Sequence, residues 1–281
     1  MRRTMKCAAG FLSILAGFSF CAGARADGAK KHLLVVDHTA GFRHGDSIAL
    51  GEKIIEDMGD KSGIFDVDYA RNADDVKAKM TPDALKAYDG VFFLQTTGDI
   101  GIPDRQSFLD YIKAGHGFIG THSATDTYHN WPGYIDMIGG EFKTHGKQVE
   151  VEVNVEDPQF PAAAALPDDM KKSFKVFDEI YEFKPESNRR TRSHIILSMS
   201  KHPQTGAPGD YWVSWCSQYG KGKVFYMSLG HRTDVWSKDW YQAYLLGGIK
   251  WALGLAEGNS SPSTAGGGTV SVINPIVIKG E

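Results

Sequence analysis

The chain has 281 residues, a formal net charge of −3 at pH 7 and only three cysteines. An excess of acidic side chains argues against nucleic acid as a partner, because phosphate binding requires a basic face. The length suffices for one large domain with a full hydrophobic core.

Residues 1–26 have the three regions of a secretory signal peptide. Basic residues come first, an apolar run follows at residues 11–23, and Ala-Arg-Ala at residues 24–26 fits the small-x-small cleavage rule. The apolar run is shorter than the roughly 20 residues that span a bilayer. We therefore expect a bacterial Sec signal, cleavage before Asp27, a periplasmic or secreted protein and no membrane attachment afterwards.

Cleavage would remove four of the 31 Lys and Arg residues and none of the 34 Asp and Glu residues, which leaves 27 against 34. It would also leave Cys216 as the only thiol, so no internal disulfide is expected. Cys216 lies in an apolar, strand-like run, where a free cysteine behaves as a small hydrophobe.

Residues 27–256 are predicted to form one α/β domain. Its first part alternates between short apolar runs and amphipathic segments, which is typical of a doubly wound parallel sheet. Strands are expected at residues 32–38, 65–70, 90–95 and 117–122. Helices are expected from Asp46 or Ser47 to a stop at Gly59 or Gly63, at residues 81–88 and at residues 103–115.

After Gly146 the pattern changes to an inserted antiparallel β region. Residues 149–155 alternate strictly between apolar and polar, which predicts a half-exposed strand. Further strands are expected at residues 178–183, 194–200, 211–219 and 223–231, before a closing helix at residues 239–254. Residues 257–281 are rich in Gly and Ser at first, so we expect a flexible linker and tail, whose last residues either add an edge strand or stay loose.

Polar loops follow four strands that should lie side by side: the first, third and fourth strands and the one at residues 223–231. Because ligands bind such sheets outside the carboxyl ends of the strands, these loops should form one crevice. They carry His44, Asp99, His122, Asp126 and His231.

His122 is the expected centre of this crevice. It leaves the end of a buried strand that is predicted to break at Gly120, where glycine lets the backbone turn sharply. Asp126 can orient the imidazole, while His44 and His231 approach from adjacent strand ends. These four residues are the candidate acid–base catalysts.

A divalent metal such as zinc is an alternative use of the same groups, with His122, Asp126, His145 and His231 as candidate ligands. No HExxH or paired-cysteine motif supports it. No GxGxxG, P-loop or Gly-x-Ser-x-Gly motif occurs either, so no nucleotide cofactor is expected. The acidic pair Asp178 and Glu179 is interpreted first as a solvated strand end, with a general acid or base as the alternative.

Six further positions are candidates for substrate contacts: Arg43, Thr97, Asp99, Trp131, His145 and Trp236. The two tryptophans lie in predicted loops among glycines, aspartates and histidines. There, a sugar-stacking role and a packing role are both consistent with the sequence.

Six motifs in order resemble the ThuA-like, trehalose-utilisation family. They are GFRH at residues 41–44, TTGD at 96–99, GTHSATDT at 120–127, GGEFKTH at 139–145, DEIYEF at 178–183 and SLGH at 228–231. The resemblance covers residues 32–254 and implies a flavodoxin-like fold related to class I glutamine amidotransferases. It also implies an association with bacterial sugar metabolism, including oxidised (3-keto) disaccharides. His116 departs from the glycines usual at that position in the family.

The resemblance also places His122 where the amidotransferase elbow Gly-x-Cys-x-Gly carries its cysteine, so glutamine hydrolysis by a thiolate cannot operate. Two classes of function remain open. One is an exported hydrolase, lyase or isomerase that acts on keto-disaccharides or related glycosides. The other is a non-catalytic carbohydrate-binding protein. In both, a small carbohydrate is the expected ligand, and a homo-oligomer is compatible with either.

Overall fold

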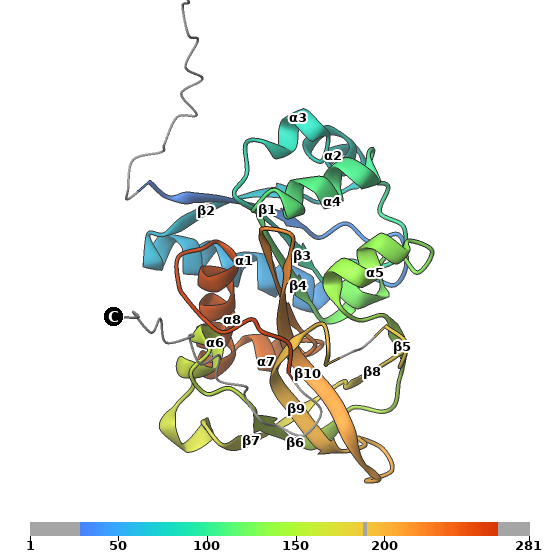
Figure 1. The fold of residues 1–281 in the computed structure, drawn as a ribbon, viewed down its shortest axis with the longest axis vertical. Coiled ribbons are helices and arrows are strands. Elements are labelled where there is room, and N and C mark those ends of the chain that lie inside the picture. Colours follow the sequence, from blue (N-terminus) through green and yellow to red (C-terminus); the bar gives the residue numbers. More distant parts are fainter. Residues whose placement is uncertain (1–28, 188–189, 264–281) are drawn as a thin grey trace, which may run out of the picture.

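The structure, a computed structural model, describes residues 29–187 and 190–263. The central sheet has nine strands in the order β2-β1-β3-β4-β11-β10-β9-β6-β7. Figure 1 shows how helices and loops surround it. The five strands from β2 to β11 are parallel to one another, and we call them the parallel half. They are β1 Lys31–Val36, β2 Phe65–Ala70, β3 Gly90–Leu94, β4 Gly117–Thr121 and β11 Gly222–Met227.

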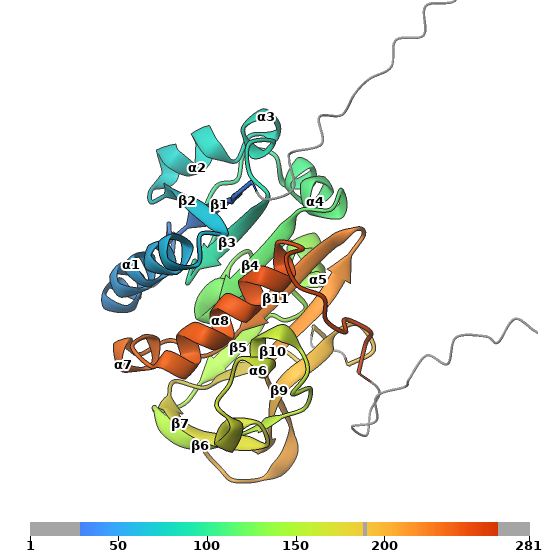
Figure 2. The ribbon, with the colours of Figure 1, turned by 90° about the vertical axis from the view of Figure 1, so that its left-hand side faces the viewer.

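Helices cover both faces of the parallel half, because its strands are apolar on both sides. In β1, Leu33 and Val35 belong to one core, whereas Leu34 and Val36 belong to the core on the opposite face. Helices α1 Gly45–Ser62 and α8 Asp239–Ala252 cover the first core (Figure 2). The second core is covered by α2 Ala73–Lys79, α3 Pro82–Leu85, α4 Arg105–Lys113 and α5 Pro132–Ile138. The predicted doubly wound, flavodoxin-like class and the neighbouring first, third and fourth strands are confirmed.

The remaining strands form an antiparallel half, as predicted for the insertion. They are β10 Pro208–Tyr219, β9 His194–Lys201, β6 Val149–Val155 and β7 Ser173–Asp178. A separate two-stranded sheet pairs β5 Phe142–His145 with β8 Tyr181–Phe183. In β6, Val151 and Val153 are buried while Glu150 and Glu152 are exposed, so the predicted half-exposed strand is confirmed.

The prediction of one strand over residues 178–183 is wrong. The chain leaves the large sheet at Asp178 and enters the small sheet only at Tyr181. The side chain of Asp178 accepts hydrogen bonds from the backbone N–H groups of Glu179 and Gly230, which takes Glu179 out of the strand ladder. Local sequence does not reveal this bend, because it depends on a partner distant in the chain.

Smaller differences concern the ends of elements. Helix α1 begins one residue before the predicted caps, with His44 at its N-cap, and it continues through Gly59 to a left-handed C-cap at Gly63. Strand β4 does not break at Gly120 but ends at Thr121. Four short helices were not predicted because four to seven residues show no clear apolar period: α2, α5, α6 Pro161–Ala164 and α7 Thr233–Trp236.

Among residues 29–187 and 190–263, no helix combines the length and apolarity needed to cross a bilayer. The predicted signal peptide and the tail from residue 264 lie outside the described residues. The start of the predicted linker contacts β9: Ser263 donates its backbone N–H to the Ser193 carbonyl at 3.0 Å, and its hydroxyl accepts from the Ile195 N–H at 3.0 Å.

Candidate functional site

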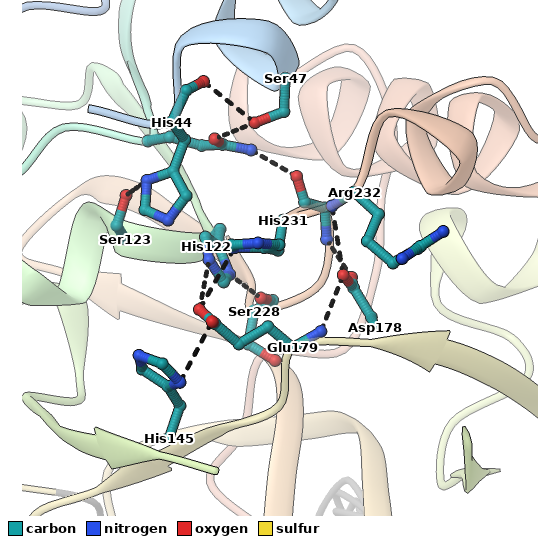
Figure 3. A network of polar contacts seen from close by, with 12 residues as sticks. His44, Ser47, His122, Ser123, His145, Asp178, Glu179, Ser228, His231 and Arg232 are labelled. Carbon is teal, nitrogen blue, oxygen red and sulfur yellow. Dashed lines mark hydrogen bonds and ion pairs between the residues drawn. The ribbon is translucent and has the colours of Figure 1, made fainter. Parts of the chain in front are cut away.

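Four side chains from different parts of the chain converge at the carboxyl ends of the parallel strands (Figure 3). His44 precedes α1, His122 follows β4, His231 follows β11, and Glu179 lies between β7 and β8. One nitrogen or oxygen atom of each lies within 4.8 Å of those of the other three. We call this group the His-Glu cluster. The crevice predicted from the strand order thus contains three of the expected residues.

The backbone is strained at the centre of the cluster. His122 has φ of 44°, a left-handed value that costs free energy in residues other than glycine. Its carbonyl is held by the Tyr226 hydroxyl at 2.5 Å. Gly120 does not form the expected turn. It leaves room for neighbouring side chains, because a Cβ there would lie 3.1 Å from the Ala124 Cβ and 3.3 Å from the Tyr226 ring.

Hydrogen bonds fix two of the cluster imidazoles from outside. The Nδ1–H of His122 donates to the Ser228 carbonyl at 2.8 Å, which leaves its Nε2 as an acceptor facing the cluster. The Nδ1 of His44 lies 3.4 Å from the Ser123 hydroxyl. The expectation that Asp126 orients His122 is therefore wrong, since the Ser228 carbonyl does so.

Two nitrogen atoms inside the cluster lack a hydrogen-bond partner among the described residues: Nε2 of His122 and Nδ1 of His231. They lie 3.4 Å and 3.2 Å from Oε1 of Glu179, within ion-pair distance but without hydrogen-bond geometry. Buried polar atoms normally have a partner, because leaving one unsatisfied costs about 1–3 kcal/mol. Their arrangement around one carboxylate oxygen fits a bound cation.

Electrostatics favour the deprotonated forms that metal binding requires in two of these groups, His44 and Glu179. Burial, together with the neighbouring His122 and His231, lowers the pKa of His44 to about 3, so this imidazole is neutral at pH 7. Burial opposes ionisation of Glu179, but its contacts with His122 and His231 outweigh burial and hold the pKa of the carboxyl below its ordinary value. Contact with Glu179 raises the pKa of His231 against the effect of burial. A cation would therefore compete with a proton at His231.

The acidic pair before β8 is buried, so its interpretation as a solvated strand end is wrong. Asp178 is fully buried and accepts from the backbone N–H groups of Gly230 at 2.7 Å and Arg232 at 3.2 Å. It thereby ties the antiparallel half to the loop that carries His231, and it places Glu179 in the cluster. The signal in the sequence was a pair of adjacent acidic residues at the end of β7, shortly before β8.

Gln95 was not predicted, although it also positions the cluster. It is fully buried at the end of β3 with φ of 52°. Its amide donates to the Gly230 carbonyl at 2.5 Å, and its carbonyl accepts from the Ser47 hydroxyl at 2.7 Å. Gln95 therefore links the start of α1 to the loop after β11, and the signal was a polar residue that ends a fully apolar strand.

His145 lies at the mouth of the cluster rather than among its four donors. Its Nδ1 is 3.1 Å from Oε2 of Glu179, and 42% of its side chain is exposed. Asp126 is elsewhere: it contacts His129 at 2.7 Å, whose other nitrogen contacts Glu141 at 2.7 Å. Asp126 and His145 are thus replaced by His44 and Glu179 in the four-residue metal group expected from the sequence.

Of the residues expected to contact substrate, Arg43 lines a cavity beside the cluster, but four others do not face it. Thr97 anchors a loop through the Phe42 carbonyl at 2.8 Å, and Asp99 pairs with Arg105 at 2.5 Å. Both tryptophans pack: Trp131 lies against the Tyr128 and Tyr134 rings, and Trp236 is fully buried, with its Nε1–H donating to the Gly230 carbonyl. The sugar-stacking interpretation of these two residues is wrong.

The cavity beside the cluster has a volume of about 430 Å³, within the usual range for small-ligand sites. His44 and His231 lie in its wall. The other lining residues come from the loops around them: Phe42, Arg43, Gly45, Asp46, Ser47, Gln148, Arg232, Thr233 and Asp234. A second cavity of about 620 Å³ lies against β8 and β10 and contains no cluster residue.

Comparisons with known proteins identify relatives of this fold. The family model for ThuA, described as trehalose utilisation, matches residues 32–252. A ThuA-like protein from Bacteroides uniformis is 22% identical with a TM-score of 0.64, covering 83% of this chain and 95% of that chain. A ThuA-like protein from Parabacteroides merdae is 19% identical with a TM-score of 0.65, covering 84% and 95%.

A cytoplasmic protein from Salmonella typhimurium is 14% identical with a TM-score of 0.53, covering 79% of this chain and 99% of that chain. No curated protein sequence matches the chain. At these identities, the similarity to the solved structures shows the fold alone.

Proposed function

The chain belongs to the ThuA family of trehalose utilisation, and from this premise we propose that it is an exported enzyme of carbohydrate metabolism whose active centre is the His-Glu cluster. The observation that carries the proposal is the pair of buried, unpartnered nitrogens that His122 and His231 direct at Glu179. A purely structural cluster would satisfy these atoms, whereas a reaction centre keeps them available.

The donor set fits a divalent transition metal such as zinc. Three imidazole nitrogens and one carboxylate oxygen are ligands that such ions accept, and the Ser228 carbonyl supplies the outer hydrogen bond that fixes the tautomer of His122. When bound, the ion would polarise a carbonyl or hydroxyl oxygen of the sugar. His44, His122, Glu179 and His231 would hold it.

His145 is the proposed proton-transfer group, because it is half-exposed at the mouth and its ring is oriented through Nδ1, which donates to the Gly146 carbonyl at 2.9 Å and lies 3.1 Å from Glu179. On a keto-disaccharide, its imidazole takes the proton from the carbon next to the ketone. The C–H electron pair then forms a carbon–carbon double bond, and the glycosidic C–O bond on the next carbon breaks. The departing oxygen takes up the proton. Among hydrolase, lyase and isomerase chemistry, we therefore propose a lyase.

Metal analysis and turnover test this proposal together. Purified wild-type protein should hold about one divalent ion per chain after dialysis and should cleave 3-keto-trehalose, as followed by mass spectrometry. His122→Ala should lose both properties. His116→Ala is the matched control, since His116 stands before the amino end of β4 whereas His122 follows its carboxyl end, and it should retain both.

Two results would change this picture. Retained metal and turnover in His122→Ala would refute the cluster as the centre. Tight sugar binding with no turnover over a broad panel would instead indicate the non-catalytic carbohydrate-binding protein. Export rests on residues 1–26 and has its own test: the intact mass of protein from the native host should correspond to a chain that begins at Asp27.

A further inference from the structure

An exposed aromatic side chain lies in the wall of the cavity beside the His-Glu cluster. Three large hydrophobic residues are exposed in the described chain: Phe42 at 69%, Phe177 at 45% and Leu255 at 42%. Phe42 lines the cavity, and Phe177 lies under the Arg232 guanidinium, which also lines it, with 5.0 Å from Cζ to the ring centroid. An exposed Phe forgoes about 1.5–3 kcal/mol of hydrophobic burial, so Phe42 in the wall of this cavity calls for a functional explanation.

The Phe42 ring is exposed on a well-anchored loop. Its backbone carbonyl accepts from the Thr97 hydroxyl, and the neighbouring Gly41 N–H donates to that same hydroxyl at 3.2 Å. Arg43 donates to the Asp37 carbonyl at 2.6 Å. The ring meets His44 edge-on, at 4.8 Å between centroids and 80° between planes. An aromatic face is therefore held in solvent directly beside a cluster imidazole.

The opposite wall presents a fixed guanidinium. Arg232 donates from Nε to Asp234 at 2.7 Å and from Nη1 to Gln148 at 2.7 Å, while its plane lies over Phe177. The two arginines of the cavity wall are matched by two aspartates, Asp46 and Asp234. These four side chains thus add no net charge to the wall, which suits a neutral ligand with many hydroxyl groups.

We infer that this cavity is the sugar subsite of the His-Glu cluster, in which Phe42 stacks on the apolar C–H face of a pyranose ring and Arg232 binds its hydroxyl groups. The inference rests on the proposed function and adds a substrate class, namely neutral, unphosphorylated glycosides. It assigns to Phe42 the stacking role that the sequence suggested for Trp131 and Trp236. A ring stacked on Phe42 lies next to His44 and therefore within reach of the cluster.

Calorimetric titration of metal-loaded protein with trehalose, methyl α-glucoside and their 3-keto derivatives tests the subsite. Phe42→Ala should weaken sugar affinity on the order of ten-fold without changing the metal content or the melting temperature. Phe42→Trp should keep the affinity and show a change in fluorescence on sugar binding that wild-type protein lacks. Leu255→Ala, the exposed hydrophobic outside the cavity, is the matched control and should bind like the wild type. Trehalose 6-phosphate should bind more weakly than trehalose.

The outcomes separate this inference from the proposed function. If Phe42→Ala binds sugars like the wild type while His122→Ala loses its metal, the subsite is wrong and the metal centre stands. If metal-loaded wild-type protein binds none of the sugars, the proposed function itself fails. Sedimentation velocity covers the remaining case, because an oligomer that Phe42→Ala dissociates would make Phe42 a subunit contact and overturn the inference.

Discussion

The parallel and antiparallel halves of the sheet contribute different chemistry to the same cluster. The parallel half supplies three imidazoles from the loops that follow its strands: His44 after β1, His122 after β4 and His231 after β11. The antiparallel half supplies the carboxylate of Glu179, and the small sheet beside it supplies His145. The parallel half alone would thus offer three imidazoles and no negative charge. The insertion provides the one negative charge of the cluster, which favours a bound cation.

The largest effect is expected at Asp178, where the two halves are joined. Asp178→Ala leaves the buried N–H groups of Gly230 and Arg232 without their acceptor, and each unsatisfied donor costs about 1–3 kcal/mol. We expect the free energy of unfolding to fall by about 3–5 kcal/mol. Urea denaturation followed by circular dichroism measures it.

Asp178→Asn is the comparison variant, since it keeps the shape of the side chain but only one acceptor oxygen, whereas both carboxylate oxygens of Asp178 accept from backbone N–H groups. It should therefore recover only part of the lost stability. Full stability in Asp178→Asn would show that a single acceptor oxygen suffices to join the halves.

Glu179→Gln tests the contribution of the antiparallel half to the site itself. The amide keeps the volume but removes the negative charge between His122 and His231. We expect the affinity for Zn²⁺ to fall by about 100-fold, or about 2.7 kcal/mol, in competition titrations with a chromophoric chelator. Glu182→Gln, on the neighbouring β8, should leave it unchanged. An unaltered Zn²⁺ affinity in Glu179→Gln would show that the three imidazoles suffice.

The two halves also differ in how far the sequence predicts them. In the parallel half, runs such as residues 90–94 are buried on every side, so composition alone marks the strand and the polar residue after it. This is why His122 and His231 could be assigned to one crevice. Glu179 could not, because its place depends on a bend set by the contact between Asp178 and Gly230.

The tryptophans show a second limit of sequence information. Neighbouring glycines and histidines suggested that Trp131 and Trp236 face a ligand, yet both are packed against other rings or backbone. Composition describes what surrounds a residue along the chain, whereas exposure depends on residues brought close by folding. Phe42 could not be recognised as exposed for the same reason.

Trp131→Phe tests the packing of the parallel half without touching the cluster. Trp131 fills the space between Tyr128 and Tyr134, so a smaller ring leaves a partial cavity. We expect a loss of about 1–2 kcal/mol in unfolding free energy, measured by urea denaturation, with sugar affinity unchanged. A large loss of sugar affinity at unchanged stability would restore the stacking interpretation.

The smallest effect is expected at the second His-carboxylate group. Burial disfavours the charged form of His129, but contacts with Glu141 and Asp126 raise its pKa above the ordinary value. A raised folded-state pKa adds stability that is fully present below pH 6.5 and is lost as the pH rises through the folded value. His129→Asn should therefore lower the free energy of unfolding more at pH 5.5 than at pH 8.5, by about 0.5–1 kcal/mol after solvent screening.

His116 gives the opposite case, since burial lowers its pKa. The melting temperature of His116→Asn, relative to that of the wild type, should therefore be higher at pH 5.5 than at pH 8.5. Differential scanning calorimetry at both pH values compares the two variants. The same sign of pH dependence in both would show that neither histidine controls it.

The wide separation of the cluster residues along the chain has a consequence for folding kinetics. About 190 residues lie between His44 and His231, and the strands that carry them are joined by crossovers, a topology that folds slowly because distant segments must meet. No contiguous stretch of the chain contains more than a fragment of the cluster. An ion held as proposed would therefore enter the cluster only after these long-range contacts have formed, at the end of folding.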